Sequence, residues 1–150
     1  MTADGERSCV FCQIGTGQAD AAIAYQDEHT TVIMDLRQPG WPDAAHVLVL
    51  PQAHVEVIDA LSADLAAQLM QSVVRVARAL RRAFEPEGIS VWQSNGDAAG
   101  QEVQHVHFHL LTRWAGDGLL RIYPSKPTMP GREDLRPVAD RLRFELGSPL

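Results

Sequence analysis

The chain has 150 residues, of which 45% are hydrophobic and 21% are charged, and its formal net charge is -6. This length suits one domain with a hydrophobic core of its own. The acidic balance argues against a protein that grips the phosphate backbone of DNA or RNA, because such proteins need a basic face. A small phosphorylated ligand is compatible with it, since backbone N–H groups and a few imidazoles can hold one.

The sequence predicts no membrane partner and a cytoplasmic location. No apolar stretch is long enough to cross a bilayer, and the first residues lack the basic-then-apolar order of a secretory signal. The two cysteines, Cys9 and Cys12, form a C-x-x-C pair. In a reducing compartment such a pair favours a metal site or free thiols over a structural disulfide.

Hydrophobic periodicity predicts five strands, one long helix and a final helix. The predicted strands cover residues 21–25, 30–35, 46–51, 88–95 and 105–112. Apolar side chains recur at helical spacing over 62–85, with Ser62 as the expected N-cap: Leu65, Leu69, Val73, Val76 and Leu80. The final helix is expected over Asp134–Leu146, with Pro137 in its first turn. Mostly hairpin-length connections around one long helix predict an α+β domain with an antiparallel sheet.

Three of the six histidines stand at alternate positions in QHVHFHLLT, residues 104–112: His105, His107 and His109. Side chains of a strand alternate between its two faces, so these imidazoles are predicted to share one face. The side chains between them would form the other face, which is mostly apolar and can pack on the long helix: Gln104, Val106, Phe108 and Leu110.

Three interpretations of this row compete: a chance arrangement, a metal site and nucleophilic catalysis. One zinc ion bound by all three histidines is strained, because residues i and i+4 of a strand lie about 13 Å apart while zinc–nitrogen bonds are about 2.1 Å. One or two of these histidines, with ligands from elsewhere, would hold a metal more easily. A neutral imidazole, whose ordinary pKa lies near 6.5, can instead attack phosphorus while a flanking imidazole moves the proton.

The segment GQEVQHVHFHLL resembles the signature of the histidine-triad (HIT) superfamily, and the resemblance extends over about residues 9–114. The bacterial Hint-like branch is the most similar. The resemblance implies a single HIT domain over 1–150, with residues 115–150 as a C-terminal extension. It also implies a five-stranded antiparallel sheet with one long helix and a short N-terminal helix, and a homodimer that joins two sheets into one of ten strands. The implied activity is hydrolysis or transfer on a nucleoside phosphoramidate or another nucleotidyl ester or anhydride.

The resemblance also assigns roles to single residues. His107 is the implied nucleophile, which forms a nucleotidyl-histidine intermediate that water then hydrolyses. His109 would contact the phosphate and assist the leaving group or the water, and His46 would support the triad electrostatically or simply begin a strand. The implied nucleotide contacts are Asp35 on the ribose, Gly100 at the phosphate, and Asn95 and Gln101 at the phosphate or the leaving group. Around the base they are Phe11, Ile14 and Leu36, although these three could equally be core residues.

Two features depart from the family pattern. Glu102 stands where many relatives carry Ser or Thr, and an ionised carboxylate cannot donate a hydrogen bond to phosphate. It is expected to face a basic residue, to bind an amine leaving group or to point away. The stretch between Asp35 and His46 is about three residues longer than the Hint-like pattern and contains Trp41, a candidate lid or dimer contact. Farther along, three basic residues are candidate anion contacts or surface charges: Arg113, Arg121 and Lys126.

Four residues match the ligands of a structural zinc in bacterial members with C-x-x-C: Cys9, Cys12, His54 and His105. Two thiolates and two imidazoles form a normal closed tetrahedral zinc set. Free thiols and a redox pair are the alternatives, although the redox pair lacks the strand-then-helix context of such motifs.

Three functions therefore remain in competition. The leading one is a nucleotidyl hydrolase or transferase that acts through His107. The others are a non-catalytic nucleotide- or partner-binding module on the same fold and a zinc hydrolase that activates water. If His107 is the nucleophile it must be neutral, so activity is expected to fall on acidification through the pKa region of histidine.

Overall fold

The computed structural model describes residues 9–40, 42–119 and 127–147, so Trp41, Arg121 and Lys126 lie outside the described residues. The chain divides into two compact units, Met1–Asp117 and Gly118–Leu150. This division lies close to residue 115, where the sequence predicts that a C-terminal extension begins; the single domain stays a prediction. Among the described residues, no helix combines the length and the apolar character that a membrane crossing needs.

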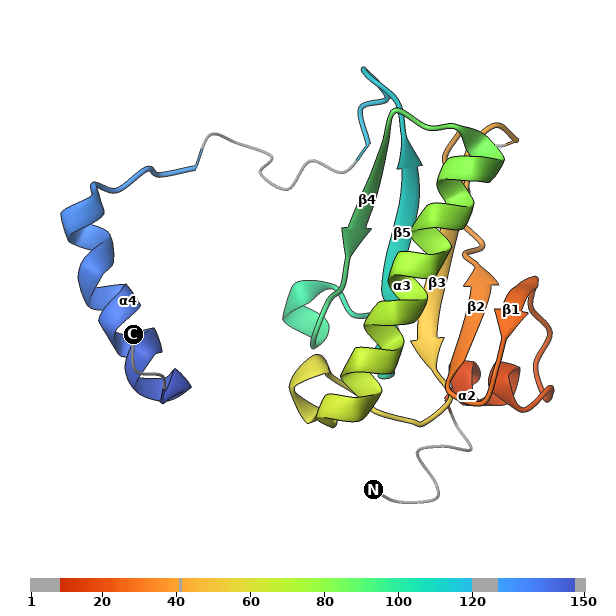
Figure 1. Cartoon of the computed structure of the whole chain (residues 1–150), viewed down its shortest axis with the longest axis horizontal. Helices are drawn as coiled ribbons and strands as arrows, with labels where there is room; N and C mark the ends of the chain where they lie inside the picture. The colour runs from red at the N-terminus through yellow and green to blue at the C-terminus, as the bar shows by residue number, and fades with distance from the viewer. Residues whose placement is uncertain (1–8, 41, 120–126, 148–150) are drawn as a thin grey trace. The chain divides into compact units, whose positions relative to one another are not determined.

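The first unit holds a five-stranded sheet, which confirms the predicted α+β architecture (Figure 1). Its strands are β1 (Ile23–Gln26), β2 (Thr30–Met34), β3 (His46–Pro51), β4 (Gly88–Trp92) and β5 (Phe108–Arg113). They are arranged in the order β1-β2-β3-β5-β4, and every neighbouring pair is antiparallel. Strands β3 and β5 therefore lie side by side near the centre, while β1 and β4 form the edges.

The long helix α3 (Ala63–Phe84) covers one face of this sheet (Figure 1). It begins at the predicted cap, because the Ser62 hydroxyl accepts the Leu65 N–H at 3.2 Å. It ends where Glu85 turns into the left-handed region with φ 48°. Predicted stripe residues such as Leu69 and Val73 are buried against inward-facing side chains of the sheet. The hydrophobic periodicity of residues 62–85 therefore predicted both this helix and the face that it buries.

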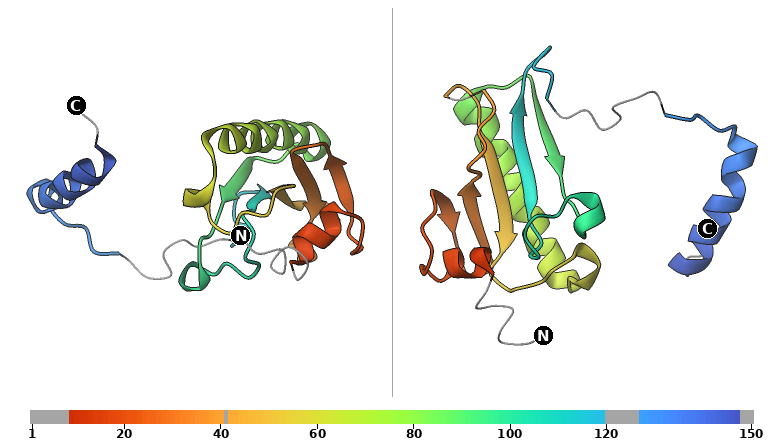
Figure 2. Two further views of the ribbon diagram at one scale, coloured as in Figure 1. Left: turned by 90° about the horizontal axis from the view of Figure 1, so that it is seen from below. Right: turned by 180° about the vertical axis from the view of Figure 1, so that it is seen from behind.

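A short helix, α2 (Val10–Gly15), lies on the opposite side of the sheet (Figure 2). Its Phe11 and Ile14 pack with Ile33, Leu48 and Leu50 in a second hydrophobic cluster. All six residues of β3 are buried, because this strand has a hydrophobic cluster on each face. Such a strand is a rigid platform for side chains that project from its α2 side.

Several predicted boundaries were wrong. The first strand covers 23–26, and β4 ends at Trp92, the last residue that pairs with β5; the side chains of Gln93 and Asn95 beyond it bond to each other. The last strand begins only at Phe108, since the preceding backbone turns away and the Val106 N–H donates to the carbonyl of Val55 at 2.7 Å. His105 and His107 thus precede the strand.

The second unit contains α4 (Arg132–Leu146), which begins two residues before the predicted start. The Asp134 carboxylate accepts the backbone N–H of Gly131 at 3.1 Å, so Asp134 lies at the third helical position and the cap is Gly131. Pro137 was predicted in the first turn of the helix, but it falls in the second. An acidic residue is common anywhere in the first turn of a helix. Asp134 alone therefore could not distinguish a helix that begins at Arg132 from one that begins at Asp134.

Candidate functional site

The triad imidazoles lie on the face of the sheet that α3 does not cover. In the register of the sheet, His109 on β5 is directly opposite Leu48 on β3 and Trp92 on β4. Leu48 belongs to the cluster beneath α2, whereas Phe108 and Leu110 pack under α3. The predicted alternation is therefore correct in the strand, and it continues into the irregular segment, where Val106 is in the α3 cluster and His107 contacts Phe11.

Backbone carbonyls fix the tautomer of His107. Its Nδ1 lies 2.7 Å from the carbonyl oxygen of His105, and a carbonyl can only accept, so Nδ1 carries the proton. In the neutral ring the lone pair must then be on Nε2. His107 thus has a nucleophilic nitrogen on the side of the ring away from the backbone.

The same reasoning orients His46 and His109. The Nδ1 of His46 donates to the carbonyl of Arg37 at 3.0 Å, so its Nε2 must accept the Nδ1–H of His109, 3.1 Å away. His109 is left with its lone pair on Nε2. The centroids of the His107 and His109 rings are 4.8 Å apart, so the two lone-pair nitrogens belong to adjoining imidazoles.

Trp92 packs flat against His109, with ring centroids 4.5 Å apart and an angle of 2° between the planes. It also stacks on His46 at 5.3 Å. Sequence reasoning missed Trp92, since only the register of β4 against β5 places it opposite His109. Arg37 was missed as well, because its partner Glu102 lies far away in the sequence.

Burial keeps the triad neutral near pH 7. Desolvation lowers the pKa of His107 below its ordinary value, against the opposing effects of its hydrogen bond to His105 and the charges of Asp35 and Glu102. Desolvation, followed by the neighbouring His107 and His46, lowers the pKa of His109 to about 4. Both rings are therefore available as lone-pair donors without prior deprotonation.

Asp35, Arg37 and Glu102 form a chain of ion pairs beside these imidazoles. The Arg37 Nε donates to Asp35 Oδ1 at 3.2 Å, and its Nη1 donates to Glu102 Oε1 at 2.9 Å. Burial tends to raise the pKa of Asp35, but the hydrogen bonds from Arg37 and the charge of His46 hold it below its ordinary value. Of the three orientations considered for Glu102, the structure shows the one that faces a basic residue.

The extra residues between Asp35 and His46 are tied to the sheet by Gln38. Its amide nitrogen donates to the carbonyls of Asp35 at 2.6 Å and His46 at 2.7 Å, and its amide oxygen accepts the His46 N–H at 2.9 Å. The start of the insertion, which carries Arg37, is thereby held against the first residue of β3.

The predicted phosphate loop is held by its own amides. Gln101 accepts the N–H of Gly96 and donates to the carbonyl of Glu56, both at 2.6 Å, while Asn95 accepts the N–H of Ile58 at 2.7 Å. Gly100 has φ 80°, a left-handed conformation that a side chain would strain. Contacts of Asn95, Gly100 and Gln101 with phosphate stay predictions.

The residues predicted around the base are not equivalent. Phe11 and Ile14 are buried in the cluster beneath α2, which is the core-packing alternative, and Phe11 also meets His107 edge-on at 5.1 Å. Leu36 is fully exposed. Both carboxylate oxygens of Asp35 already lie within hydrogen-bond range of Arg37. The contact of Asp35 with ribose stays a prediction.

The four predicted zinc ligands are brought together. The ligand atoms of Cys9, Cys12, His54 and His105 all lie within 4.8 Å of one another. The Nε2 of His105 donates to the carbonyl of Pro51 at 2.9 Å, so its Nδ1 lone pair faces the thiols, 3.4 Å from Cys9 Sγ and 3.5 Å from Cys12 Sγ. This donor set and spacing fit a tetrahedral zinc ion, and four protein ligands would leave no open position for substrate.

A second cluster of potential ligands does not converge in the same way. Asp35, His46 and His109 are also within 4.8 Å of one another, but His46 directs its two nitrogens to different neighbours. The three side chains therefore form a hydrogen-bonded and electrostatic series, with His46 between a carboxylate and an imidazole.

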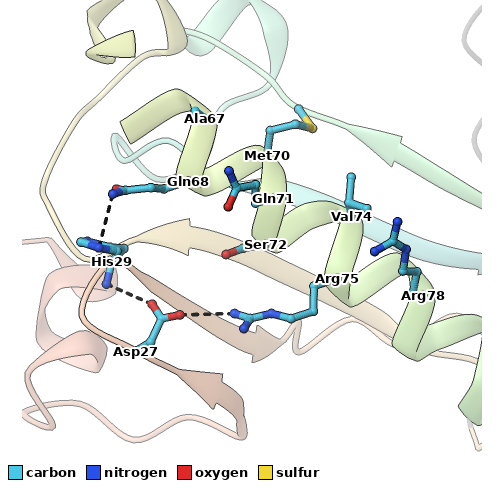
Figure 3. Close-up of a pocket in the computed structure, with 10 residues that line it drawn as sticks. All are labelled: Asp27, His29, Ala67, Gln68, Met70, Gln71, Ser72, Val74, Arg75 and Arg78. Atoms are coloured by element: carbon cyan, nitrogen blue, oxygen red, sulfur yellow. Dashed lines mark hydrogen bonds and ion pairs between the residues drawn. The ribbon is translucent and has the colours of Figure 1, made fainter. Parts of the chain in front are cut away.

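Two hollows lie outside the triad. One, of about 720 Å³, is formed by α3 and the turn between β1 and β2, where Asp27 pairs with Arg75 (Figure 3). The other, of about 380 Å³, borders the cysteine cluster and is lined by Cys9, Val10, His54, Glu56, Glu102, Val103 and Gln104. Neither is lined by His107 or His109.

Comparison with known proteins agrees with this geometry. The family model of the HIT domain matches residues 16–116. "Protein hit" of Bacillus subtilis is 34% identical over 142 residues, which cover 94% of this chain and 96% of that protein. The adenosine 5'-monophosphoramidase hnt1 of Schizosaccharomyces pombe is 29% identical, with 93% of this chain and 98% of that protein covered.

Solved structures give the same result. A HIT-family protein from Bacillus subtilis has a TM-score of 0.83 at 33% identity, covering 95% of this chain and 99% of that chain. A zinc-bound histidine-triad protein from Mycobacterium smegmatis has a TM-score of 0.67 at 32% identity, covering 93% of this chain and 99% of that chain. The alternating histidines, the five-stranded sheet and these matches lead to one conclusion: the chain belongs to the HIT family.

Proposed function

We propose that this protein is a nucleotide-binding hydrolase that cleaves a nucleotidyl phosphoramidate or a related ester or anhydride through a covalent intermediate on His107. The observation that carries this proposal is the hydrogen bond from His107 Nδ1 to the His105 carbonyl, which leaves the Nε2 lone pair free to attack. The phosphoramidase from Schizosaccharomyces pombe supports the reaction class.

Two displacements at phosphorus complete the reaction. In the first, the Nε2 lone pair of His107 forms an N–P bond, and the bond to the leaving group breaks with its electron pair. An amine leaving group takes a proton from solvent, because His109 is neutral in the resting protein. In the second, His109 Nε2 accepts a proton from water, the water oxygen bonds to phosphorus, and the N–P electron pair returns to His107; His109 then releases its proton to solvent. His46 orients His109 by accepting its Nδ1–H.

Turnover of adenosine 5'-phosphoramidate tests this proposal. The wild type should release AMP, and His107→Ala should lose at least about 10³-fold in kcat, as removal of a covalent nucleophile does. His29→Ala is the matched control, because His29 is exposed and contacts Gln68 on α3, outside the triad. Unchanged turnover by His107→Ala would rule out His107 as the nucleophile. Tight AMP binding by a wild type that turns over none of the phosphoramidates and anhydrides offered would favour the binding-module alternative.

We also propose that Cys9, Cys12, His54 and His105 hold a structural zinc ion. The zinc-bound relative from Mycobacterium smegmatis and the convergence of the four ligand atoms support it. When bound, the ion would cross-link the N-terminal segment to the residues before β5. A thiolate metal site of this kind also fits the predicted cytoplasmic location, because a reducing compartment keeps a C-x-x-C pair available to a metal.

A homodimer is the proposed assembly, with a nucleotide as the small-molecule partner and neither nucleic acid nor membrane involved. Strand β4 is an edge strand, and its Val91 is exposed. Met70 and Val74 on α3 are exposed as well, and they line the hollow in Figure 3. Pairing of two β4 edges would join the sheets into one of ten strands and cover apolar surface.

A further inference from the structure

Arg37 is the cation of the ion-pair chain beside the triad, and its two carboxylate partners differ sharply in burial. The side chain of Asp35 is 5% exposed, while that of Glu102 is 68% exposed and that of Arg37 is 63% exposed. We propose that Arg37 binds the phosphate of the nucleotide, that Asp35 anchors it, and that Glu102 is an exchangeable partner which the phosphate displaces. This inference rests on the proposed function in taking a nucleotide as the ligand.

The difference in burial decides which partner is exchanged. Asp35 is held in place by the Arg37 backbone N–H at 2.7 Å as well as by the guanidinium, and it lies in the interior. Breaking that contact would leave a buried carboxylate without its cation, which is costly. A solvent-exposed pair such as Arg37–Glu102 contributes little, so another anion can replace Glu102 with almost no loss.

The Arg37 guanidinium has N–H donors that neither carboxylate uses. Three of its N–H groups are used: Nε and Nη2 toward Asp35, and Nη1 toward Glu102. A guanidinium carries five N–H donors, so two remain, and release of Glu102 frees a third. A phosphate can therefore be bound through more than one N–H while Asp35 keeps its hold.

Arg37 is also placed correctly for the reacting group. The Arg37 carbonyl accepts the His46 Nδ1–H, and His46 in turn bonds to His109. Two hydrogen bonds therefore connect Arg37 to the last histidine of the triad. The Arg37 guanidinium donates to Asp35 Oδ2, which lies 3.8 Å from His46 Nδ1, and His46 Nε2 lies 3.1 Å from His109 Nδ1. A phosphate attacked by His107 would be within the field of Arg37.

The charge of the site requires a residue of this kind. Asp35 and Glu102 both bond to Arg37 beside the triad, and two carboxylates would repel an incoming phosphate. Glu102 lies in the loop predicted to run along the phosphate, where its ionised side chain can donate no hydrogen bond. Arg37 supplies both the compensating charge and the donors that Glu102 cannot.

Equilibrium binding of AMP and of adenosine separates a phosphate contact from a general effect on the site. Arg37→Ala should weaken AMP binding by about tenfold or more, because a charge-assisted hydrogen bond is lost, and should change adenosine binding by less than about twofold. Glu102→Gln, an exposed and conservative change, should tighten AMP binding by about two- to fivefold, since the competitor for Nη1 loses its charge. Arg75→Ala, which removes a comparably exposed arginine paired with Asp27, should change neither.

The outcomes are distinguishable. A wild type that binds neither AMP nor adenosine would contradict the proposed function, and this inference with it. AMP binding that survives Arg37→Ala unchanged, or that weakens in parallel with adenosine binding, would overturn the role of Arg37 and leave the proposed function standing. Weaker AMP binding in Glu102→Gln would overturn the exchange, because Glu102 would then assist the phosphate and not compete with it.

Discussion

Trp92 and His109 lie face to face, with their ring centroids 4.5 Å apart and their planes 2° from parallel. The two residues come from neighbouring strands and are directly opposite in register. The indole thereby limits rotation of the imidazole and favours the orientation in which His109 donates to His46. Trp92 is a positioning residue in this account, since it acts through His109.

Replacement of Trp92 tests that role. Trp92→Leu should lower kcat about two- to tenfold with little change in KM, because stacked aromatic pairs contribute roughly 0.5–1.5 kcal/mol beyond simple burial. Trp92→Phe keeps an aromatic face and should restore most of the rate. Steady-state kinetics of both variants check the prediction, and equal losses in the Phe and Leu variants would contradict a role for the aromatic face.

The pH dependence of kcat/KM follows from the depressed pKa values of the triad. The pKa of His109 is lowered from its ordinary 6.5 to about 4, and the pKa of His107 is lowered as well. Both rings therefore keep their lone pairs at pH values below the usual titration range of histidine. Activity should be retained as the pH falls through 6.5 and should be lost as it approaches about 4. This places the acid limb lower than the sequence alone suggested. A half-maximal rate at pH 6.5 or above in a rate profile would contradict the burial argument.

Removal of the proposed zinc ion should lower the stability of the fold before it lowers the rate of turnover. Chelation, or Cys12→Ser, should lower the melting temperature measured by circular dichroism, because the ligands link α2 to the segment before β5. At temperatures where the protein stays folded, turnover should change by less than about threefold, since a four-ligand site has no open position. Loss of turnover in chelated but fully folded protein would favour the zinc-hydrolase alternative.

The core beneath α3 offers a prediction on stability. Leu69→Ala should reduce the free energy of unfolding by about 2–5 kcal/mol in urea titrations, because Leu69 is fully buried against the sheet. Leu36→Ala is the matched control, since Leu36 is fully exposed and the same truncation there should cost less than about 0.5 kcal/mol. Similar losses at the two positions would contradict the assignment of the core.

Periodic patterns predicted the parts of this fold that they directly encode. The repeat from Leu65 to Leu80 predicted α3, and the alternation from Val106 to Leu110 predicted which side chains of β5 and of the segment before it face α3. The family pattern predicted that the four proposed zinc ligands would converge, although they lie far apart in the chain. Such patterns depend on local spacing or on motifs, both of which are visible in one sequence.

Contacts that depend on register and loop path could not be predicted. Trp92 stacks on His109 only because β4 pairs with β5 in one register. Arg37 contacts Glu102 from a stretch whose start Gln38 ties to β3, and Arg37 and Glu102 lie far apart in the sequence. The start of β5 was misplaced because the backbone before Phe108 bonds to Val55, a long-range contact with no local signal.

The covalent intermediate on His107 is the central claim, and intact-protein mass spectrometry tests it most directly. The protein is mixed briefly with a nucleotidyl substrate and quenched at alkaline pH, because a phosphorus–nitrogen bond to imidazole hydrolyses in acid. The wild type should gain the mass of one nucleotidyl group, mapped to the peptide that contains His107. His109→Ala should accumulate more of this adduct, since the base for hydrolysis is gone, and His107→Ala should show none. An adduct on another residue, or sustained turnover by His107→Ala, would contradict the mechanism.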